Sequence, residues 1–188
     1  MDHLWSPWRL EYIVGAKPKT GCVFCTAARS PLTNSADPQS DLQSSLQSAV
    51  TDLQCDPLVL CQGSHCYVIL NLYPYNNGHL MVVPYKHVDT LTGLEPRELH
   101  ELAELTQRSE LALRRAYNLE GINMGVNLGK VAGAGIVEHI HVHLVPRWLG
   151  DTNFMPVIGQ TRVLPEELGA TAARLRPIFD ELARLDGG

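Results

Sequence analysis

The run EHIHVHLVPRW, residues 138–148, alternates histidine with apolar residues, and it restricts how this chain can fold more than any other feature. Successive side chains of a β-strand point to opposite faces of the sheet. The run therefore predicts a strand with His139, His141 and His143 on one face and apolar side chains on the other. Three imidazoles in register favour a chemical role over a half-exposed strand that carries histidine by chance.

Two kinds of chemistry use this pattern. Histidines two positions apart on a strand can both bind zinc, with a catalytic water as the fourth ligand. Alternatively, a neutral imidazole attacks phosphorus while a neighbouring imidazolium stabilises the charged oxygens. The preceding segment NLGKVAGAG, residues 127–135, favours phosphate, because its three glycines let backbone N–H groups approach an anion. A flexible hairpin connection is the competing interpretation of this loop.

Short β-branched and apolar runs bounded by glycine, proline and asparagine predict the remaining strands. Together with the histidine run, the expected strands are residues 57–61, 66–71, 79–84, 122–128 and 139–146. The tight turn YPYNNGH, residues 73–79, joins two of them as a hairpin and indicates an antiparallel sheet. Helical segments accompany the strands, so the pattern predicts an α+β fold.

One long amphipathic helix is expected within residues 94–119, with Pro96 at its start. Its apolar stripe consists of Leu99, Leu102, Leu105, Leu113 and Tyr117. A C-terminal helix is expected to open near Pro165 and to bury Leu168, Leu175, Phe179 and Leu182. Pro177 should break or kink this second helix.

The chain of 188 residues has a net charge of −5 and is expected to form one domain, residues 1–188, with a polar insertion at about 27–56. A short surface helix after Asp41 is plausible within the insertion. The negative charge excludes a broad footprint for nucleic acid or anionic membrane, so a small-molecule partner is expected. The absence of a leader-like or membrane-length apolar run, with an odd number of cysteines, predicts a cytoplasmic protein with reduced thiols or metal ligands.

Cys22 and Cys25, in the motif CVFC, form half of a zinc site and need two further ligands. Two ordinary reduced cysteines or a redox pair are the alternatives. A redox pair usually lies at a helix N-terminus in a βαβ unit, which this pattern does not supply. Cys55 and Cys61 are expected to be buried or half-buried thiols.

The segment HIHVHLVP matches the signature His-φ-His-φ-His-φ-φ, φ being apolar, of the histidine triad (HIT) family of nucleotidyl hydrolases and transferases, which this chain resembles. The segment LNLYPYNNGHLMVVPYKH, residues 70–87, is similar to the family's ribose-binding region. PRWLGDTNF and LWSPWRLEY resemble the bacterial branch that includes diadenosine tetraphosphate phosphorylases. The resemblance covers residues 5–25 and 57–175 and implies a HIT-like fold, an antiparallel sheet with one long helix and a C-terminal helix.

The resemblance also implies a role for each matching residue. His141 is the nucleophile that forms a covalent nucleotidyl-histidine, His143 contacts the phosphate and assists the leaving group, and His79 flanks the same site. The implied substrate-binding residues are Asn71 for the ribose, Asn127, Gly133, Ala134 and Gly135 for the α-phosphate, and Lys130 for a distal phosphate, although a solvated loop lysine is equally expected. Several relatives carry a polar donor where this chain has Gly135. Either backbone N–H groups or Asn127 replace that donor, or the leaving-group preference differs.

For the metal, the resemblance implies that His87 and His139 complete the zinc site of Cys22 and Cys25. His65 or Cys66 is a rival for the fourth ligand. Zinc is then structural, and magnesium is expected only with a polyphosphate substrate.

The implied enzyme cleaves the α-phosphoanhydride of dinucleoside polyphosphates, such as diadenosine tetraphosphate, with phosphate or water as acceptor. The alternatives are a hydrolase of adenosine phosphoramidate-type conjugates, a non-catalytic nucleotide-binding module, and zinc hydrolysis at the triad itself. A homodimer joined through the sheet and the long helix is also implied, with Trp148, Asn153 and Phe154 near its interface. Trp5 and Trp8 are expected to close a core or an interface rather than to stack on a base.

Overall fold

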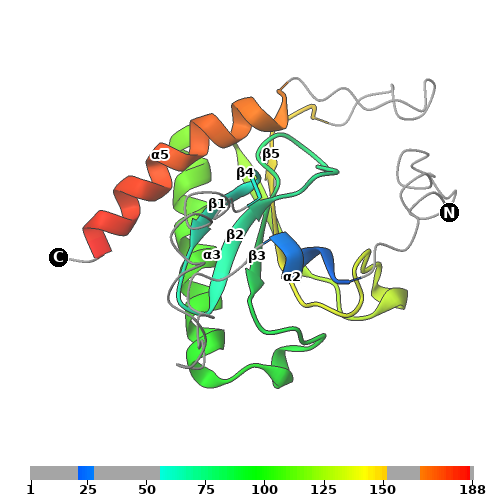
Figure 1. Ribbon diagram of the computed structural model, residues 1–188. Helices are drawn as coiled ribbons and strands as arrows, with labels where there is room; N and C mark the ends of the chain where they lie inside the picture. The colour runs from blue at the N-terminus through cyan, green and yellow to red at the C-terminus, as the bar shows by residue number, and fades with distance from the viewer. Residues whose placement is uncertain (1–20, 28–55, 152–165, 187–188) are drawn as a thin grey trace, which may run out of the picture.

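A five-stranded sheet is the centre of the computed structural model, which describes residues 21–27, 56–151 and 166–186. The strands are β1 (Val59–Gln62), β2 (Cys66–Leu70), β3 (Leu80–Pro84), β4 (Gly121–Val126) and β5 (Val142–Arg147). They are ordered β1-β2-β3-β5-β4, and every neighbouring pair is antiparallel (Figure 1). This arrangement confirms the expected α+β fold with an antiparallel sheet.

Three helices accompany the sheet in the described part of the chain. They are α2 (Val23–Ala27), α3 (Pro96–Ala116) and α5 (Leu168–Asp186), and short 3-10 helices occupy Leu91–Gly93 and Lys130–Ala132. The backbone N–H of Glu95 donates to the carboxylate of Glu98 at 2.7 Å, which closes the first turn of α3. Proline also occupies this first turn, so the predicted start of the long helix is confirmed.

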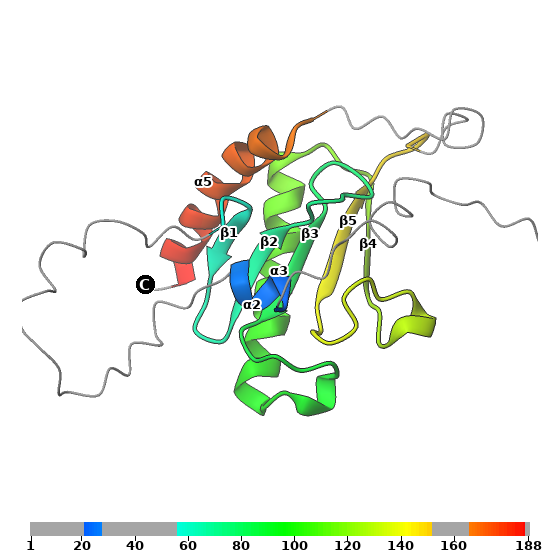
Figure 2. The same cartoon turned by 45° about the vertical axis from the view of Figure 1, so that its right-hand side comes forward.

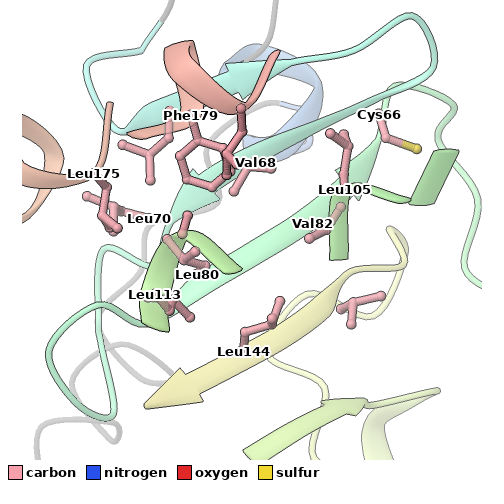
Figure 3. Close-up of a cluster of buried hydrophobic side chains, with 14 of the residues drawn as sticks. Cys66, Val68, Leu70, Leu80, Val82, Leu105, Leu113, Leu144, Leu175 and Phe179 are labelled. Carbon is pink, nitrogen blue, oxygen red and sulfur yellow. The ribbon is translucent and has the colours of Figure 1, made fainter. Parts of the chain in front are cut away.

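Helices α3 and α5 cover one face of the sheet and enclose the larger hydrophobic core (Figure 3). The core joins Leu105 and Leu113 of α3 with Leu175 and Phe179 of α5 over the apolar side chains of β2, β3 and β5. The prediction is wrong for one residue of the stripe, because Leu99 is 44% exposed. The carbonyl of the preceding residue, Glu98, reaches Cys66 of β2, so Leu99 is exposed because it lies to one side of the buried stripe of α3.

The opposite face of the sheet carries α2 (Figure 2). Backbone pairing places Val59, Ile69, Met81 and His143 in one row across β1, β2, β3 and β5. Directly paired residues of antiparallel strands share a face. Phe24 of α2 packs against the same row, in a second cluster that includes Val59, Ile69 and Met81. The face that bears His143 is therefore the face covered by α2.

The strand predicted over residues 139–146 begins later than expected, at Val142. Pairing with both β3 and β4 ends at this residue. The backbone N–H of Ile140 instead donates to the carbonyl of Val88, at 2.7 Å, outside the sheet. His139 and His141 therefore lie on the segment ahead of β5, and only His143 is within the strand.

Helix α5 continues through Pro177, so the predicted break at this proline is wrong. A proline inside a helix removes one backbone hydrogen bond and crowds the preceding turn. Here Leu175 lies before Pro177 and Phe179 after it, and both are buried against the sheet. Tertiary packing on both sides of the proline offsets the local cost.

Some sequence-based expectations fall outside the described residues. They concern nearly all of the 27–56 insertion with its expected helix, and also Trp5, Trp8, Cys55, Asn153, Phe154 and Pro165. The single domain over 1–188 stays a prediction. None of the described helices has the length and apolar character needed to span a membrane.

Candidate active site and metal site

His141 is held in one tautomer by its own backbone neighbour. Its Nδ1 lies 2.8 Å from the carbonyl oxygen of His139. A carbonyl only accepts hydrogen bonds, so Nδ1 carries the ring proton and Nε2 keeps its lone pair. Burial lowers the pKa of His141, because the charged imidazolium loses its hydration. A neutral imidazole with a nucleophilic Nε2 follows.

His143 is oriented by His79, which comes from the end of the 71–79 turn. The backbone N–H of Tyr75 donates to Nδ1 of His79 at 3.1 Å, so the ring proton of His79 is on Nε2. This Nε2 lies 3.0 Å from Nδ1 of His143 and donates to it. The remaining nitrogen of His143, Nε2, is then the one that can donate a proton or a hydrogen bond.

Aromatic contacts hold these imidazoles in place. The ring centroids of His141 and His143 are 4.6 Å apart, and Phe24 lies 4.9 Å from His141 on the other side. Tyr75 stacks on His79 at 5.0 Å. The rotamers of the three histidines are therefore determined by packing as well as by hydrogen bonds.

The two histidines open into a pocket on the α2 face of the sheet. Its lining includes the predicted residues Asn71, Asn127, Gly133, Gly135, His141 and His143. His79 lies behind His143 rather than at the surface of the pocket, and it is 1% exposed. Lys130 and Ala134 were also expected at the phosphate, but neither is among the lining residues. Lys130 is exposed at the start of a 3-10 helix.

The glycine loop uses part of its backbone for its own turn. The N–H of Gly133 donates to the carbonyl of Lys130 at 3.0 Å, and that of Ala134 donates to the carbonyl of Gly129 at 3.3 Å. Gly133 has a φ of 90°, in the left-handed region that favours glycine. Of the three consecutive loop residues Gly133, Ala134 and Gly135, only Gly135 has a backbone N–H with no hydrogen bond of this kind within the described residues.

Sequence reasoning missed the aromatic and apolar part of this pocket. Phe24, Tyr73, Tyr75, Met81 and Ile136 all line it. A signal existed for some of them: Phe24 stands inside CVFC, and both tyrosines stand in the turn between Asn71 and His79. An apolar or aromatic residue in such a position looks like core, and only the folded chain shows that it faces the pocket.

Cys22, Cys25, His87 and His139 converge on one point beside the pocket. Their ligand atoms all lie within 4.8 Å of one another. Nδ1 of His139 is 3.3 Å from Sγ of Cys22 and 3.5 Å from Sγ of Cys25, and Nδ1 of His87 is 3.3 Å from Sγ of Cys25. Zinc bonds of ordinary length at tetrahedral angles place ligand atoms about 3.5 Å apart, so this set fits zinc.

The protonation of these ligands also suits a metal. Nε2 of His139 lies 2.8 Å from the carbonyl oxygen of Pro84 and donates to it, which leaves the lone pair on Nδ1, facing the cysteines. Burial raises the pKa of Cys25 to about 11. At neutral pH a thiolate here therefore requires a bound cation, which a zinc ion supplies.

The rival ligands are absent from this group. Cys66 is buried under α3, with its Sγ 3.6 Å from the carbonyl oxygen of Glu98. His65 precedes Cys66 at the start of β2, and neither belongs to the group of four. Within the described residues, His87 is the fourth ligand that the geometry favours.

Known proteins resemble this chain in sequence. Residues 53–148 match the model of the HIT domain. A protein named AP-4-A phosphorylase from Mycobacterium tuberculosis (strain H37Rv) is 39% identical over 171 residues, which cover 91% of this chain and 80% of that protein. A bis(5'-adenosyl)-triphosphatase from Dictyostelium discoideum is 30% identical over 122 residues, covering 61% of this chain and 80% of the relative.

Solved structures resemble it in fold. A Zn-bound histidine triad family protein from Mycobacterium smegmatis superposes with a TM-score of 0.56 and 26% identity, over 68% of this chain and 87% of that chain. A hypothetical histidine triad nucleotide-binding protein from Sulfolobus tokodaii superposes with a TM-score of 0.57 and 27% identity, over 69% and 88% of the two chains. The family model, the relatives and the shared fold agree with the histidine arrangement described above, and the chain belongs to the HIT domain family.

Proposed function

We propose that this protein is an enzyme that cleaves a phosphoanhydride bond of dinucleoside polyphosphates, of which diadenosine tetraphosphate is the representative substrate, with His141 as the nucleophile. The observation that carries the proposal is the hydrogen bond between Nδ1 of His141 and the carbonyl of His139. It directs the lone pair of a neutral imidazole away from the backbone, at the edge of a pocket lined by His143 and Asn127. The names of two relatives, a phosphorylase and a triphosphatase of such dinucleotides, support the same substrate class.

In the first step, Nε2 of His141 attacks the α-phosphorus of the substrate. A P–N bond forms, the bond from this phosphorus to the bridging oxygen breaks, and the electron pair leaves on the nucleoside polyphosphate. The proton on Nδ1 stays there, hydrogen bonded to the carbonyl of His139, and stabilises the positive charge that the ring acquires. With diadenosine tetraphosphate the products of this step are an adenylyl-histidine and ATP.

His143 assists the departure of the leaving group. His79 donates to Nδ1 of His143, so Nε2 of His143 can donate to the phosphate oxygens or to the bridging oxygen. We assign Asn127 and the backbone N–H of Gly135, which line the pocket, to the non-bridging oxygens, and Asn71 to the ribose hydroxyls. Either Asn127 or the backbone N–H groups serve in place of the polar side chain that several relatives carry at the position of Gly135, or the leaving-group preference differs.

In the second step, an acceptor oxygen attacks the same phosphorus and the P–N bond breaks, which returns His141 to its neutral form. Inorganic phosphate as acceptor yields ADP, and water yields AMP. Two displacements through a reactive phosphoramidate replace one difficult displacement of an anhydride.

Zinc in this scheme is structural. When bound by Cys22, Cys25, His87 and His139, it supplies a cross-link between α2 and the segment that carries the nucleophile. His139 is the shared residue: its ring faces the cysteines and its carbonyl orients His141. Any residue would supply the carbonyl, so the place of the ring among the metal ligands is the reason for histidine at the first position of the triad.

The first experiment is intact-protein mass spectrometry after a brief reaction with diadenosine tetraphosphate. We expect a transient mass increase of one adenylyl group on the wild type and none on His141→Ala. A parallel assay with and without inorganic phosphate identifies the acceptor: ADP and ATP that form only when phosphate is added indicate phosphorolysis, and AMP and ATP indicate hydrolysis. Turnover without an adduct, abolished at once by chelation, would reassign the triad to a metal site. Binding without turnover of any dinucleotide would favour a regulatory module, and turnover confined to adenosine phosphoramidates would favour that hydrolase class.

We also propose a homodimer that pairs through the edge strand β4. This strand lies at the free edge of the sheet, and its apolar side chain Met124 is 50% exposed. Unpaired edges that carry apolar residues are liable to associate. Light scattering of the purified protein measures its mass directly, and a monomer at micromolar concentration would contradict the proposal.

A further inference from the structure

The turn that carries His79 is fastened to the end of β5 by the side chain of Asn76. Its Nδ2 lies 3.0 Å from the carbonyl oxygen of Pro146 and 2.9 Å from Oδ2 of Asp151. A carbonyl and a carboxylate only accept hydrogen bonds, so the amide nitrogen faces them and each of its two N–H groups has one acceptor. Asn76 therefore holds the turn to the strand that bears His143.

Asn76 is also bonded directly to His79. Its carbonyl oxygen accepts a hydrogen bond from the backbone N–H of His79 at 3.2 Å. The backbone N–H of the preceding residue, Tyr75, donates to Nδ1 of the same histidine at 3.1 Å. One residue thus connects the backbone of His79 to β5, and its neighbour orients the ring.

Asp151, the second acceptor, is itself held in place. The guanidinium of Arg147 donates to both carboxylate oxygens, and the backbone N–H of Trp148 donates to Oδ2 at 3.2 Å. The side chain of Asp151 is 7% exposed. Arg147 also donates to Oδ1 of Asn123 on β4, at 2.8 Å. The carboxylate that Asn76 binds is therefore fixed relative to both β4 and β5.

Packing stops the turn from moving closer to β5. Gly78 has a φ of 71°, in the left-handed region that favours glycine. A Cβ at this position would lie 2.9 Å from Cε2 of Tyr117 and 3.3 Å from Cγ of Pro146, so the backbone of the turn is already pressed against both side chains. The turn is free to move only away from the strand, and the two amide hydrogen bonds of Asn76 oppose that movement.

The distance that this arrangement controls is the 3.0 Å between Nε2 of His79 and Nδ1 of His143. A hydrogen bond weakens steeply as its length and angle depart from the ideal. We propose that Asn76 is a positioning residue of the active site: it holds the turn before β3 on the end of β5, and so keeps His79 within hydrogen-bond distance of His143. The consequence for turnover rests on the proposed function, whereas the state of His143 can be observed without substrate.

Nitrogen-15 NMR of the substrate-free protein, labelled at its histidines, tests the positioning. The shifts of an imidazole show which ring nitrogen carries the proton, and His143→Gln assigns the signals of His143. On the alkaline side of the histidine titration we expect a single tautomer of His143 in the wild type, protonated on Nε2. Asn76→Ala should give a mixture of both tautomers. A mixture in the wild type, or an unchanged tautomer in folded Asn76→Ala, would overturn the proposal.

Steady-state kinetics with diadenosine tetraphosphate test the consequence. Asn76 is not among the residues that line the pocket, so Asn76→Ala should lower kcat by at least about fivefold with little change in KM. In the His79→Leu background the same substitution should lower kcat by less than about twofold, because the contact that it supports is already lost. An equal factor in both backgrounds would contradict the proposal, since Asn76 would then act independently of His79.

Asn77→Ala is the matched control. It removes an amide from the next residue of the same turn, whose Oδ1 has no hydrogen-bond partner among the residues that the structure describes. This variant should leave both the tautomer of His143 and kcat unchanged. A change as large as that of Asn76→Ala would show that any disturbance of the turn suffices, and would remove the specific role of Asn76.

Thermal unfolding shows whether each variant is folded. Asn76→Ser, which keeps one donor on a shorter side chain, replaces the alanine variant if that variant does not fold, and the same results are expected of it. If the wild type turns over no dinucleotide, the proposed function fails, and the tautomer of His143 still decides whether Asn76 positions His79.

Discussion

Nε2 of His79 lies 3.0 Å from Nδ1 of His143, although 64 residues separate the two in the chain. The contact joins the turn before β3 to His143 of β5. Because Tyr75 donates to the other nitrogen of His79, the pair has a single direction of donation, from His79 to His143. In the proposed reaction, His79 would therefore act through His143.

Replacing His79 should slow the chemical step more than it weakens substrate binding. His79→Leu removes the donor to His143, and we expect kcat to fall at least about tenfold with little change in KM. His79→Gln keeps an N–H donor and should retain more of kcat than the leucine variant. The pH dependence of kcat for both variants should shift, since the basicity of His143 changes. Equal losses for the two variants, without such a shift, would reduce His79 to a packing residue.

Removal of a metal from the Cys22, Cys25, His87 and His139 site should lower the thermal stability of the protein and should not act directly on the chemical step. A structural zinc contributes directly to the free energy of folding. We expect chelation, or Cys22→Ser, to lower Tm by more than about 5 °C. Cys61→Ser is the control, because this half-buried thiol of β1 lies outside the ligand group. Immediate loss of turnover at unchanged Tm would point to a catalytic metal instead.

The ion pair of Arg147 and Asp151 should give stability that depends on pH. Two hydrogen bonds join them, at 2.5 Å from Nε and 2.7 Å from Nη2, and they hold the pKa of Asp151 well below its usual range. The unfolded carboxyl titrates near its usual value of about 3.9, so the unfolded state binds more protons at low pH. The stabilisation is complete above about pH 5 and declines as the pH falls below about 4.

Urea unfolding of Asp151→Asn measures this contribution. We expect the variant to be less stable than the wild type by about 1 to 3 kcal/mol at pH 7, with a smaller difference at pH 3. Asp151 also accepts from Asn76 at 2.9 Å, in the turn that leads to His79, so part of the loss should reach activity. A difference that stays constant with pH would show that the carboxylate charge is unimportant.

Glu101 on α3 closes the turn between β1 and β2. Its carboxylate accepts hydrogen bonds from the backbone N–H groups of Ser64, His65 and Cys66. Glu101→Ala leaves these donors unsatisfied, and we expect it to cost about 1 to 3 kcal/mol in urea unfolding at pH 7. Glu104→Ala, on an exposed position of the same helix, should cost much less. Similar losses for both would mean that water replaces the carboxylate.

Most helices and strands could be predicted from the sequence alone, because their residue patterns are local. Alternation predicted the strands, and a stripe at helical spacing predicted α3. CVFC and the triad identified most chemical groups, since spacing along one segment determines which side chains share a face. Two predictions were wrong for reasons that a local pattern does not contain. Leu99 lies to one side of the buried stripe of α3, and the helix continues through Pro177 because the residues on both sides of it are packed in the core.

Tertiary structure decided what depends on distant segments. His87 reaches Cys25 only because folding brings the loop after β3 beside α2. The backbone N–H of Tyr75 determines which nitrogen of His79 carries the proton only once the turn is folded. Ahead of β5, the N–H of Ile140 donates to the carbonyl of Val88, and the carbonyl of His139 accepts from the ring of His141. Residue types and spacing therefore determined which groups are available for the chemistry. The contacts between separate segments decided their tautomers, their partners and the lining of the pocket, because each of these depends on atoms that only folding brings together.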